Sequence, residues 1–546
     1  MALLVTGLHL PDRDADPAPQ VARHLGMPGA RLVAVRVVKR SLDARRRPPV
    51  VRVNCQVELS PQDEGAVLAR GIPGVRPFTE RDAQRAGLQG SPAAVSPGWD
   101  DASRPVVVGA GPAGLFCALR LAEAGARPRL IERGEPVEAR HHRVARHWTH
   151  GELDPESNVL FGEGGAGTFS DGKLHTRIRS GLVGYVLQRL VDFGAAPGIL
   201  TEAHPHVGTD KLRGILVRMR QRLLDLGAEV RFSARVEGLL VERGRCDGVR
   251  LTGGEQVIGQ PVVLATGHGA ADSARCFVEA GLSAEARPFA VGARIEHQRA
   301  LIDQARLGRW AAAEGAAAYR LVAPPRADVR QAYTFCMCPG GIVIPAGERE
   351  GITVVNGMSG SHRGSRWSNA AVVAPVSLGD FGAEGPLAGL DFRDRIERAA
   401  WSAGGGRFVA PAQRAGDLVA GRASSTLPHV SYPLGVIPTD LREVLPGPVI
   451  EAIIAALHAF ERRIPGFAGD GAVLIAPETR TAAPWRFHRG EDRQALGVRG
   501  CYPIGEGMGW GGGIVSAAVD GVRTADVILC AGTRGRPGAS LNASSP

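Results

Sequence analysis

The chain has 546 residues, 44% of them hydrophobic, and a formal net charge of +10. This length predicts two or three domains with full hydrophobic cores. No apolar run reaches the ~20 residues of a membrane-spanning helix, and the first residues show neither the basic region nor the cleavage site of an export signal, so we expect a cytoplasmic protein. In such a protein the eight cysteines predict free thiols rather than disulfides.

Residues 1–98 are expected to form a small α+β domain. Short apolar segments at 32–38 and 50–57 alternate with a helical stretch at 21–25. The compact basic run at 39–47, KRSLDARRR, could bind phosphates, but no stripe of aromatic residues accompanies it to stack bases. We therefore expect no nucleic-acid partner, and an RNA-associated protein that uses this domain is kept as an alternative.

The segment 104–134 predicts a dinucleotide-binding Rossmann unit. An apolar strand at 105–108 leads into the G-x-G-x-x-G spacing of Gly109, Gly111 and Gly114. The first glycine permits a tight turn, the second lets backbone approach a pyrophosphate, and the third lets the following helix pack on the strand. A second predicted strand follows and ends just before an acidic residue. This residue lies about 20 positions after the glycines, where an acid can accept hydrogen bonds from a ribose. The predicted cofactor contacts of this unit are Gly109, Gly111, Pro112, Ala113, Gly114, Glu132 and Arg133.

Two later segments indicate which dinucleotide binds. An apolar strand at 261–264 leads into Ala-Thr-Gly, and a glycine-rich turn at 500–513 runs into a helix from about residue 514. FAD needs such a distant partner because its flavin lies far from its adenosine. The N-terminus of the last helix would direct its positive end at the flavin and favour the anionic reduced ring. The residues predicted to bind FAD in these later parts are Val236, Thr266, Gly267, Gly505, Glu506, Gly512, Gly513 and Ile514.

The segment 158–174 repeats the glycine spacing without being a second fingerprint. Small and polar residues at 170–172 interrupt any following helix, so we expect a loop whose amides face the flavin or its phosphates. Lys173 is one of three lysines in a chain with 65 Lys and Arg residues. We interpret it as a compact charge near the flavin, the alternative being an ordinary surface lysine. The predicted contacts here are Gly164, Gly165, Thr168, Gly172 and Lys173.

Several motifs in order resemble one family. After the glycine fingerprint come FGEGGAGTFSDGKL, HVGTDKL, RPFAVGARIEH, FCMCPGG, VNGMS and YPIGEGMGWGGGIVSAAVDG. Together they resemble a bacterial family of FAD-dependent dehydrogenases, most of whose members lack an assigned reaction. The resemblance spans nearly the whole chain, but it does not indicate which substrate the protein acts on.

The resemblance implies an α/β protein with a glutathione-reductase-type FAD-binding Rossmann domain. It also implies an inserted mixed β-sheet substrate domain and a small α+β N-terminal domain. We place the N-terminal domain at 1–98, a linker around 91–103, the first part of the FAD-binding domain at 104–284, the substrate domain at 285–475, the closing part of the FAD-binding domain at 476–532 and a disordered tail at 533–546.

Lys173, His206 and His268 are the candidate catalytic residues. His268 directly follows Ala-Thr-Gly and His206 lies in AHPHVGTD, so both are expected near the dinucleotide. A histidine there could protonate a substrate atom during hydride transfer, while a structural hydrogen bond is the alternative for each. His204 and His206 have no neighbouring ligand cluster, so no metal site is expected.

Arg294, Arg480 and Trp510 are the candidate substrate-binding residues. An arginine could anchor a substrate carboxylate, and Arg294 could instead form a salt bridge. Cys336 and Cys338, in FCMCPGG, invite a redox interpretation. A disulfide across one intervening residue is strained, so the spacing favours structural or substrate-lining thiols.

The sequence therefore predicts an FAD-dependent oxidoreductase. As a dehydrogenase or reductase, it would transfer hydride between flavin N5 and an unidentified small molecule. Because one complete fingerprint is present, NAD(P)H would bind transiently as a donor. A flavin-dependent monooxygenase is an alternative, since its fold begins with the same fingerprint, and an RNA-associated flavoprotein is another. Neither the substrate nor the oligomeric state follows from the sequence.

Overall fold

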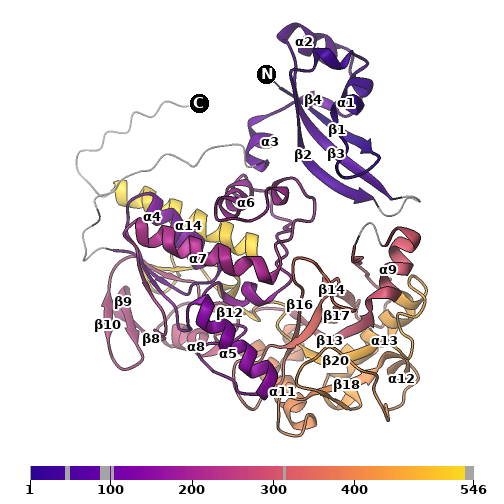
Figure 1. The fold of residues 1–546 in the computed structure, drawn as a ribbon. Coiled ribbons are helices and arrows are strands. Elements are labelled where there is room, and N and C mark those ends of the chain that lie inside the picture. The colour runs from indigo at the N-terminus through magenta and orange to yellow at the C-terminus, as the bar shows by residue number, and fades with distance from the viewer. Residues whose placement is uncertain (1, 44–48, 87–98, 100–103, 312–314, 535–546) are drawn as a thin grey trace.

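The computed structural model describes residues 2–43, 49–86, 99, 104–311 and 315–534. These residues form a small N-terminal domain, a second domain built on a parallel sheet and a third domain built on a six-stranded sheet (Figure 1). The mixed α/β class predicted from the sequence is confirmed. Within the described residues, no helix combines the length and the apolar character that crossing a bilayer requires.

The N-terminal domain is a four-stranded sheet in the order β2-β3-β1-β4. Buried and half-exposed residues alternate along β3, so one face of the sheet packs against α1 and α2. The Arg40 N–H in β2 donates to the Thr201 carbonyl at 2.6 Å, and the Ala203 N–H donates to the Arg40 carbonyl at 2.7 Å. This main-chain bridge joins the basic run to the second domain. The elements are β1 (Ala2–Leu10), α1 (Ala18–Leu25), β2 (Ala34–Asp43), β3 (Val50–Glu58), α2 (Pro61–Ala69), β4 (Val75–Pro77) and α3 (Glu80–Arg85).

Parts of two predicted segments lie outside the described residues. They are residues 44–48 of the basic run and nearly all of the linker expected at 91–103.

The second domain contains a parallel sheet in the order β22-β11-β5-β6-β7. Val107 of β5 packs with α4, α6, α7 and α14, while Val106 and Val108 pack with the antiparallel sheet β10-β9-β8. Figure 1 shows α14 beside α4 and α7. The strands are apolar runs because both faces are covered. The elements are β5 (Val106–Val108), α4 (Pro112–Glu123), β6 (Arg129–Ile131), α5 (Val137–His150), α6 (Leu182–Asp192), α7 (Thr209–Asp225), β7 (Glu229–Arg231), β8 (Val236–Glu242), β9 (Arg245–Leu251), β10 (Gln256–Ile258), β11 (Val262–Leu264), α8 (Ala271–Glu279), β22 (Cys501–Pro503) and α14 (Ile514–Arg534).

The direction of strand order reverses at β5. The sheet continues through β6 and β7 on one side of β5 and through β11 and β22 on the other. Ligands of such sheets bind beyond the carboxyl ends of the strands at this reversal. The predicted glycine turn at 109–114 and the segments after β11 and β22 all begin there, so the topology gathers three predicted motifs.

The third domain is a sheet in the order β14-β17-β13-β20-β18-β19, antiparallel except between β18 and β19. Its core is filled by α13, whose Ile453 and Leu457 are buried with Val372 of β17. The pair β12–β21 and the hairpin β15–β16 complete the strands. The elements are β12 (Ala284–Ala286), β13 (Phe289–Gln298), α9 (Arg299–Leu307), β14 (Tyr333–Cys338), β15 (Ile342–Pro345), β16 (Val355–Met358), β17 (Trp367–Val376), α11 (Ala388–Ala403), β18 (Ala410–Arg414), α12 (Ala415–Val419), β19 (Val436–Pro438), α13 (Gly447–Glu461), β20 (Val473–Glu478) and β21 (Trp485–Phe487).

Three predicted boundaries differ from the structure. The boundary between residues 284 and 285 lies inside β12. The boundary between residues 475 and 476 lies inside β20, because the buried strand continues to Glu478. The tail expected from residue 533 begins too early, because α14 continues to Arg534. Residues 535–546 lie outside the described residues.

The contact between α14 and α4 depends on Gly521. A Cβ at this position would lie 2.1 Å from the Ala113 carbonyl oxygen and 3.2 Å from the Cys117 nitrogen. Gly521→Ala should lower the free energy of unfolding by about 1–3 kcal/mol, because the two helix backbones must separate. Denaturant unfolding of the purified variant measures this change.

The matched control is Gly214→Ala in α7, where the nearest atom to a new Cβ is a nitrogen of the flexible Arg218 guanidinium at 3.5 Å. This change should leave stability unaltered or raise it by about 0.5–1 kcal/mol. Equal stability of the two variants would contradict the importance of the α14–α4 contact.

Candidate active site

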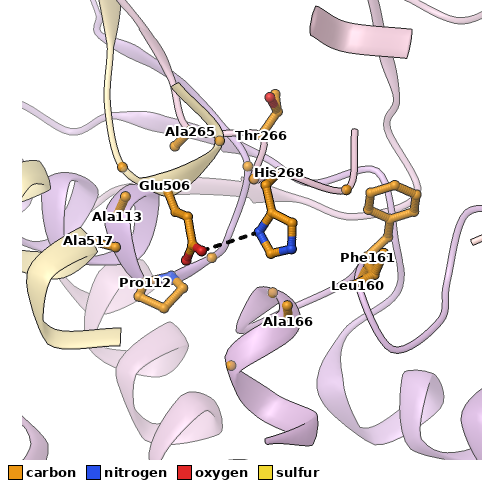
Figure 2. Close-up of a pocket in the computed structure, with 18 of the residues that line it drawn as sticks. Pro112, Ala113, Leu160, Phe161, Ala166, Ala265, Thr266, His268, Glu506 and Ala517 are labelled. Atoms are coloured by element: carbon orange, nitrogen blue, oxygen red, sulfur yellow. Dashed lines mark ion pairs between the residues drawn. The ribbon is translucent and has the colours of Figure 1, made fainter. Parts of the chain in front are cut away.

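A cavity of about 260 Å³ lies where the second and third domains meet. Segments after β5, β6, β11 and β22 form one wall, and residues of β14, β16 and β20 form another. Figure 2 shows Pro112, Ala113 and Ala517 on one side of this cavity and Leu160 and Phe161 on the opposite side.

The glycine turn brings backbones into contact at the edge of the parallel sheet. A Cβ on Gly109 would lie 2.5 Å from the Ala265 carbonyl oxygen, and one on Gly114 would lie 1.9 Å from the Gly109 carbonyl oxygen. Gly111 differs, because the nearest atom to its Cβ would be Gly165 Cα at 3.9 Å. Gly111 is the N-cap of α4, and no side chain of the described residues caps this end. The first amides of α4 can therefore bind an anion in the cavity.

Glu132 ties the glycine turn to its neighbours. Its carboxylate accepts hydrogen bonds from the N–H groups of Ala110 at 2.7 Å, Gly162 at 2.9 Å and Gly134 at 3.0 Å. The residue is 5% exposed and lines the cavity. A carboxylate offers about four lone-pair directions, so one is left for a ribose hydroxyl. Glu132 thus holds the loop at 158–174 against the turn, a role that its spacing did not predict.

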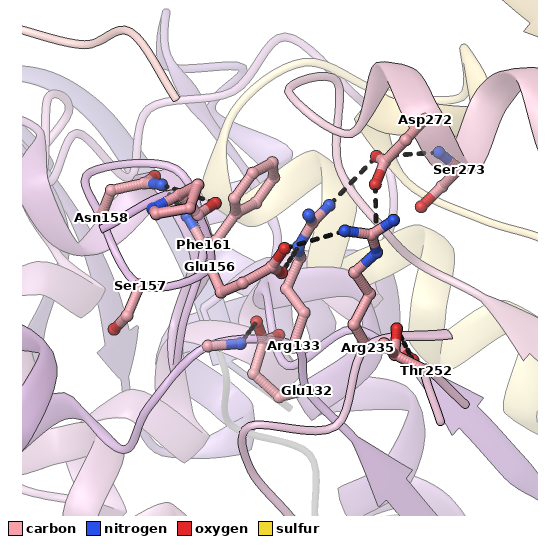
Figure 3. A network of polar contacts seen from close by, with 12 residues as sticks. Glu132, Arg133, Glu156, Ser157, Asn158, Phe161, Arg235, Thr252, Asp272 and Ser273 are labelled. Carbon is pink, nitrogen blue, oxygen red and sulfur yellow. Dashed lines mark hydrogen bonds and ion pairs between the residues drawn. The ribbon is translucent and has the colours of Figure 1, made fainter. Parts of the chain in front are cut away.

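Two arginines and two acids form a polar wall beside Glu132 (Figure 3). Arg133 Nε lies 2.8 Å from Glu156 Oε2, and Arg133 Nη1 lies 3.1 Å from Asp272 Oδ1. Arg235 Nη1 lies 3.0 Å from Glu156 Oε1. The Arg133 guanidinium also covers the Phe161 ring, 4.0 Å from its centroid. This end of the cavity therefore offers flat, charge-balanced surfaces that suit an aromatic base.

The residues present fit the FAD predicted from the sequence. Thr266 Oγ1 is buried, belongs to a cavity-lining residue and has no hydrogen-bond partner among the described residues. Together with the uncapped N-terminus of α4 it forms the donor set that a pyrophosphate requires. Past the predicted pyrophosphate site, the cavity is lined by Gly505, Gly513 and Ile514 together with Lys173. The cavity thus runs from the predicted adenosine contacts to the predicted flavin contacts.

His268 and Glu506 point toward each other inside the cavity (Figure 2), with 3.7 Å between His268 Nδ1 and Glu506 Oε1. Burial, followed by the charges of Arg480 and Arg393, lowers the pKa of His268 to about 3. Burial also raises the pKa of Glu506 to about 7, although the Gly513 amide opposes the shift. Near neutral pH the pair therefore consists of a neutral imidazole and a carboxyl group that titrates.

Lys173 lines the flavin end of the cavity. Its Nζ lies 3.0 Å from Asp171 Oδ2 and 4.0 Å from Cys338 Sγ, and its side chain is 37% exposed. Burial disfavours its charge, but the neighbouring thiols of Cys338 and Cys336 and the Asp171 carboxylate outweigh burial and raise the pKa of Lys173. The side chain is therefore a stable ammonium at this end.

Arg294 and Arg480 differ in access to the cavity. Arg294 is fully buried, with Nε 2.8 Å from Glu478 Oε2, and does not line the cavity. Direct substrate contact by Arg294 is therefore not supported. Arg480 lines the cavity and is held by Glu348 at 2.7 Å and Glu397 at 2.9 Å. Its Nη1 is buried and has no partner within the described chain, so a donor is left for an anionic ligand.

Most of the predicted site residues line this one cavity. They are Gly109, Gly111, Pro112, Ala113, Glu132, Arg133, Gly165, Lys173, Val236, Thr266, Gly267, His268, Arg480, Gly505, Glu506, Gly513 and Ile514. The remaining predicted residues are outside its lining: Gly114, Gly164, Thr168, Gly172, His206, Arg294, Trp510 and Gly512.

The side chains of Thr168 and Trp510 are hydrogen-bonded within the protein, whereas that of His206 is not. The main chain of His206 forms an isolated β-bridge with Lys173, its buried Nε2 has no partner among the described residues, and the residue is not part of the cavity lining. Thr168 Oγ1 donates to the Glu163 carbonyl at 3.2 Å. The Trp510 indole donates to the Phe487 carbonyl at 2.8 Å. The direct ligand contacts predicted for these side chains are therefore not supported.

Three of the glycines outside the lining shape the backbone instead, and Gly512 lies in an open, exposed turn. A Cβ on Gly164 would lie 2.2 Å from Thr168 Oγ1, and one on Gly172 would lie 2.8 Å from the Gly208 nitrogen. Gly114 permits the approach of α4 to the turn described above. These positions support the site without touching a ligand.

Many lining residues were not assigned to the site from the sequence, and some of them carry polar or aromatic groups. Phe161 and Arg235 form part of the wall near Glu132, and Cys336 and Glu478 lie at the opposite end. The FCMCPGG motif drew attention to the Cys336 thiol but not to its position. Arg235 directly precedes Val236, which was predicted to bind FAD. No periodicity or motif in the sequence distinguishes Arg235 from the other arginines.

Gly111→Val should abolish FAD retention while leaving the fold intact. The new side chain meets little protein, since Gly165 Cα is 3.9 Å from its Cβ, but it occupies the approach of the pyrophosphate. The measurements are FAD content after denaturation and thermal unfolding of the FAD-free proteins. Gly447→Val, at the exposed start of α13 where nothing lies within 4 Å, should keep its FAD. Equal FAD content in both variants would contradict the assignment of Gly111.

Glu506 should give the FAD-free protein a distinctive dependence of stability on pH. Because its pKa in the folded state is raised from 4.5 to about 7, its contribution is fully present below 4.5 and is lost as the pH rises through 7. Glu506→Gln cannot ionise, so its stability relative to wild type should increase by up to about 3 kcal/mol between about pH 4 and about pH 8. Denaturant unfolding at both pH values tests this. The exposed Glu279→Gln variant should show no such trend, and a flat result for Glu506→Gln would refute the buried carboxyl.

Comparisons with known families agree with the predicted cofactor. A model of an FAD binding domain matches residues 104–157, and a model described as FAD-dependent protein, C-terminal domain-like, matches residues 288–481. A domain of unknown function matches residues 11–60. An uncharacterized protein from Clostridium beijerinckii is 38% identical over 514 residues, which cover 93% of this chain and 95% of that protein.

Solved structures show a distant likeness. L-proline dehydrogenase from P. horikoshii is 12% identical with a TM-score of 0.37, covering 80% of this chain and 94% of that one. The flavin-dependent brominase Bmp2 is 12% identical with a TM-score of 0.37, covering 80% of both chains. Likeness at this level carries no functional property to this chain. The family matches, by contrast, confirm FAD as the cofactor, and the chain belongs to the family of FAD-dependent proteins that it shares with the Clostridium beijerinckii protein.

Proposed function

We propose that this protein is an FAD-dependent oxidoreductase that transfers hydride between flavin N5 and a small-molecule substrate. One observation carries the proposal. A single cavity joins the phosphate-binding turn of the second domain to ionisable groups of the third domain, among them Glu478 and Arg480. A site that held a nucleotide for structure alone would not need such groups at its far end.

Each end of the cavity has a distinct task in this proposal. Bound FAD supplies hydride chemistry, while the protein places the substrate and tunes the site. The N-terminus of α4 holds the pyrophosphate and Glu132 the ribose. Lys173 stabilises negative charge near the flavin, and Arg480 directs its unpaired donor at an anionic group of the substrate. Glu506 exchanges a proton near neutral pH, as its pKa of about 7 allows.

The number of dinucleotide-binding fingerprints in the sequence limits how a hydride donor could bind. The sequence has one complete strand–glycine–helix–acid unit, and Gly109 to Glu132 form it. NAD(P)H would therefore bind transiently against the flavin, or the substrate itself would act as the donor. Tight stoichiometric retention of NADPH beside FAD would contradict this part of the proposal.

The proposal is tested on the purified holoprotein. Denaturation should release FAD, and the bound flavin should accept one electron pair reversibly in an anaerobic redox titration. A protein that held NAD without FAD would refute the proposal. Substrate hydroxylation coupled to NADPH oxidation would instead identify a monooxygenase. Salt-sensitive RNA binding lost on deletion of residues 1–98 would favour the RNA-associated alternative.

Lys173→Met should slow reduction of the bound flavin by about 10²–10³-fold, which is typical for loss of one preorganised electrostatic contact. Lys173→Arg should recover only part of the rate, because the guanidinium group is larger than the ammonium group and its charge is more diffuse. FAD content should stay normal, since the glycine turn and Glu132 hold the other end of the dinucleotide. Stopped-flow reduction under anaerobic conditions measures the rate, and the flavin midpoint potential gives an independent readout.

The matched control is Lys211→Met, which removes an exposed lysine on α7 outside the cavity lining. It should change neither the rate nor the potential. Lys173 would be an ordinary surface lysine if Lys173→Met behaved in the same way.

A further inference from the structure

Two cysteines of β14 lie at the flavin end of the cavity. Cys336 lines the cavity, and Cys338 is fully buried behind it. Both are free thiols. In a regular strand, residues two apart share a face but are separated by ~6.6 Å along the chain. Here the register with β17 shifts between Phe335 and Cys338, and Cys336 has a φ of +44°.

This irregularity brings the Cys338 thiol against the main chain of Cys336. Cys338 Sγ lies 3.4 Å from the Cys336 carbonyl oxygen. A left-handed conformation is costly for a residue with a side chain and persists where the surroundings impose it. Bulges commonly redirect side chains next to active sites. The bulge therefore interrupts the regular strand geometry between Cys336, which lines the cavity, and Cys338.

Two cations face the thiol pair. Lys173 Nζ lies 4.0 Å and Arg294 Nη1 lies 3.8 Å from Cys338 Sγ. Asp171 holds Lys173, and Glu478 holds Arg294, so both cations are fixed in place. Positive charge beside a thiol favours the thiolate, which is the nucleophilic form.

The pKa values of the two thiols are shifted in opposite directions. A hydrogen bond from Cys338, opposed by burial and aided by Lys173 and Arg294, lowers the pKa of Cys336 well below its ordinary value. The same hydrogen bond, together with burial, raises the pKa of Cys338. The Cys336 charge also contributes to the raised pKa of Glu506, which places both groups at one end of the cavity. An accessible thiolate with a protonated thiol behind it is the arrangement of an attacking and a resolving cysteine.

We propose that Cys336 and Cys338 form a redox-active dithiol beside the FAD site, and that the substrate class is a small disulfide. This inference rests on the proposed oxidoreductase function. The Cys336 thiolate attacks one substrate sulfur, a mixed disulfide forms, and the other substrate sulfur leaves as a thiolate. Cys338 then attacks Cys336 Sγ and releases the second substrate thiolate, and the Cys338 proton passes to one of the two released thiolates.

The electrons balance over the full cycle. One substrate disulfide becomes one thiol and one thiolate, and a disulfide forms between Cys336 and Cys338. Bound FAD would supply the hydride chemistry, and a hydride equivalent that originates in a nicotinamide donor would return this disulfide to one thiol and one thiolate. Arg294 is then a positioning residue for the thiol pair rather than the substrate anchor that the sequence suggested.

The test is an anaerobic dithionite titration of holoprotein first treated with oxidised glutathione as the disulfide probe and then freed of it. Wild-type protein should accept two electron pairs per FAD, one for the flavin and one for the disulfide. Cys336→Ser and Cys338→Ser should each accept one pair. Cys530→Ser, which changes an exposed cysteine of α14, should still accept two. Peptide mass spectrometry of the treated wild-type protein should identify a bond between Cys336 and Cys338.

The outcomes separate this inference from the proposed function. Wild-type uptake of one pair, with both thiols free after treatment, would overturn the dithiol and leave the oxidoreductase intact. Failure of bound FAD to accept any pair would overturn the proposed function itself. If the serine variants lose FAD, the peptide mapping of wild type decides alone.

The rate of alkylation by iodoacetamide provides a second readout that does not depend on turnover. Cys336 should react with a pH midpoint below the ~8.5 of an ordinary thiol. Lys173→Met should move this midpoint upward, while Lys211→Met should leave it in place. An ordinary midpoint in wild-type protein would contradict the thiolate.

Discussion

Direct contact between backbones at the carboxyl edge of the parallel sheet determines how the rest of the site is arranged. A side chain on Gly114 would meet the Gly109 carbonyl, one on Gly507 would lie 2.2 Å from the Gly267 carbonyl carbon, and one on Gly521 would enter α4. Segments far apart in the sequence can converge there because none of them carries a side chain at the contact. Main-chain groups of these turns therefore form part of the cavity wall, where they can bind a phosphate.

The third domain adds charged groups on the other side of the cavity. Arg294 with Glu478 and Arg480 with Glu397 are ion pairs whose side chains are at most 1% exposed. Such pairs contribute little net stability, because removing two charges from water costs about as much as their attraction returns. Their value here is orientation. Each guanidinium is held at a fixed place beside the cavity, so positive potential is concentrated where reduced flavin, an anionic substrate or a thiolate would lie.

The sequence predicts those parts of the site that depend on short, local sequence motifs. The turn at Gly109, the acid at Glu132 and the glycines before Ile514 each follow from a short segment whose spacing reflects one backbone conformation. His206 illustrates the limit, because its motif is local but its access to the cavity depends on how the loop at 158–174 packs. Arg294 lies on a predicted strand, yet which wall that strand faces is decided by its pairing with β17 and β20.

Other features could not be predicted because they arise from tertiary geometry alone. The hydrogen bonds from Gly162 to Glu132 join positions 30 residues apart, and no spacing rule links them. The positive φ of Cys336 depends on a shift in strand register, so its sequence resembles that of any strand. The predicted end of the third domain fell inside β20 for a related reason, since an apolar run does not reveal which sheet it will join.

The order of strands in the parallel sheet has a consequence for protein synthesis. β5 pairs with β11, and β11 pairs with β22, whose residues are made more than two hundred positions later. Contacts between such distant segments form slowly and late, and domains generally fold in the order in which they leave the ribosome. The N-terminal domain can fold early, but the cofactor cavity lacks a wall until residues beyond Cys501 have emerged. Acquisition of FAD is therefore expected to follow the synthesis of β22.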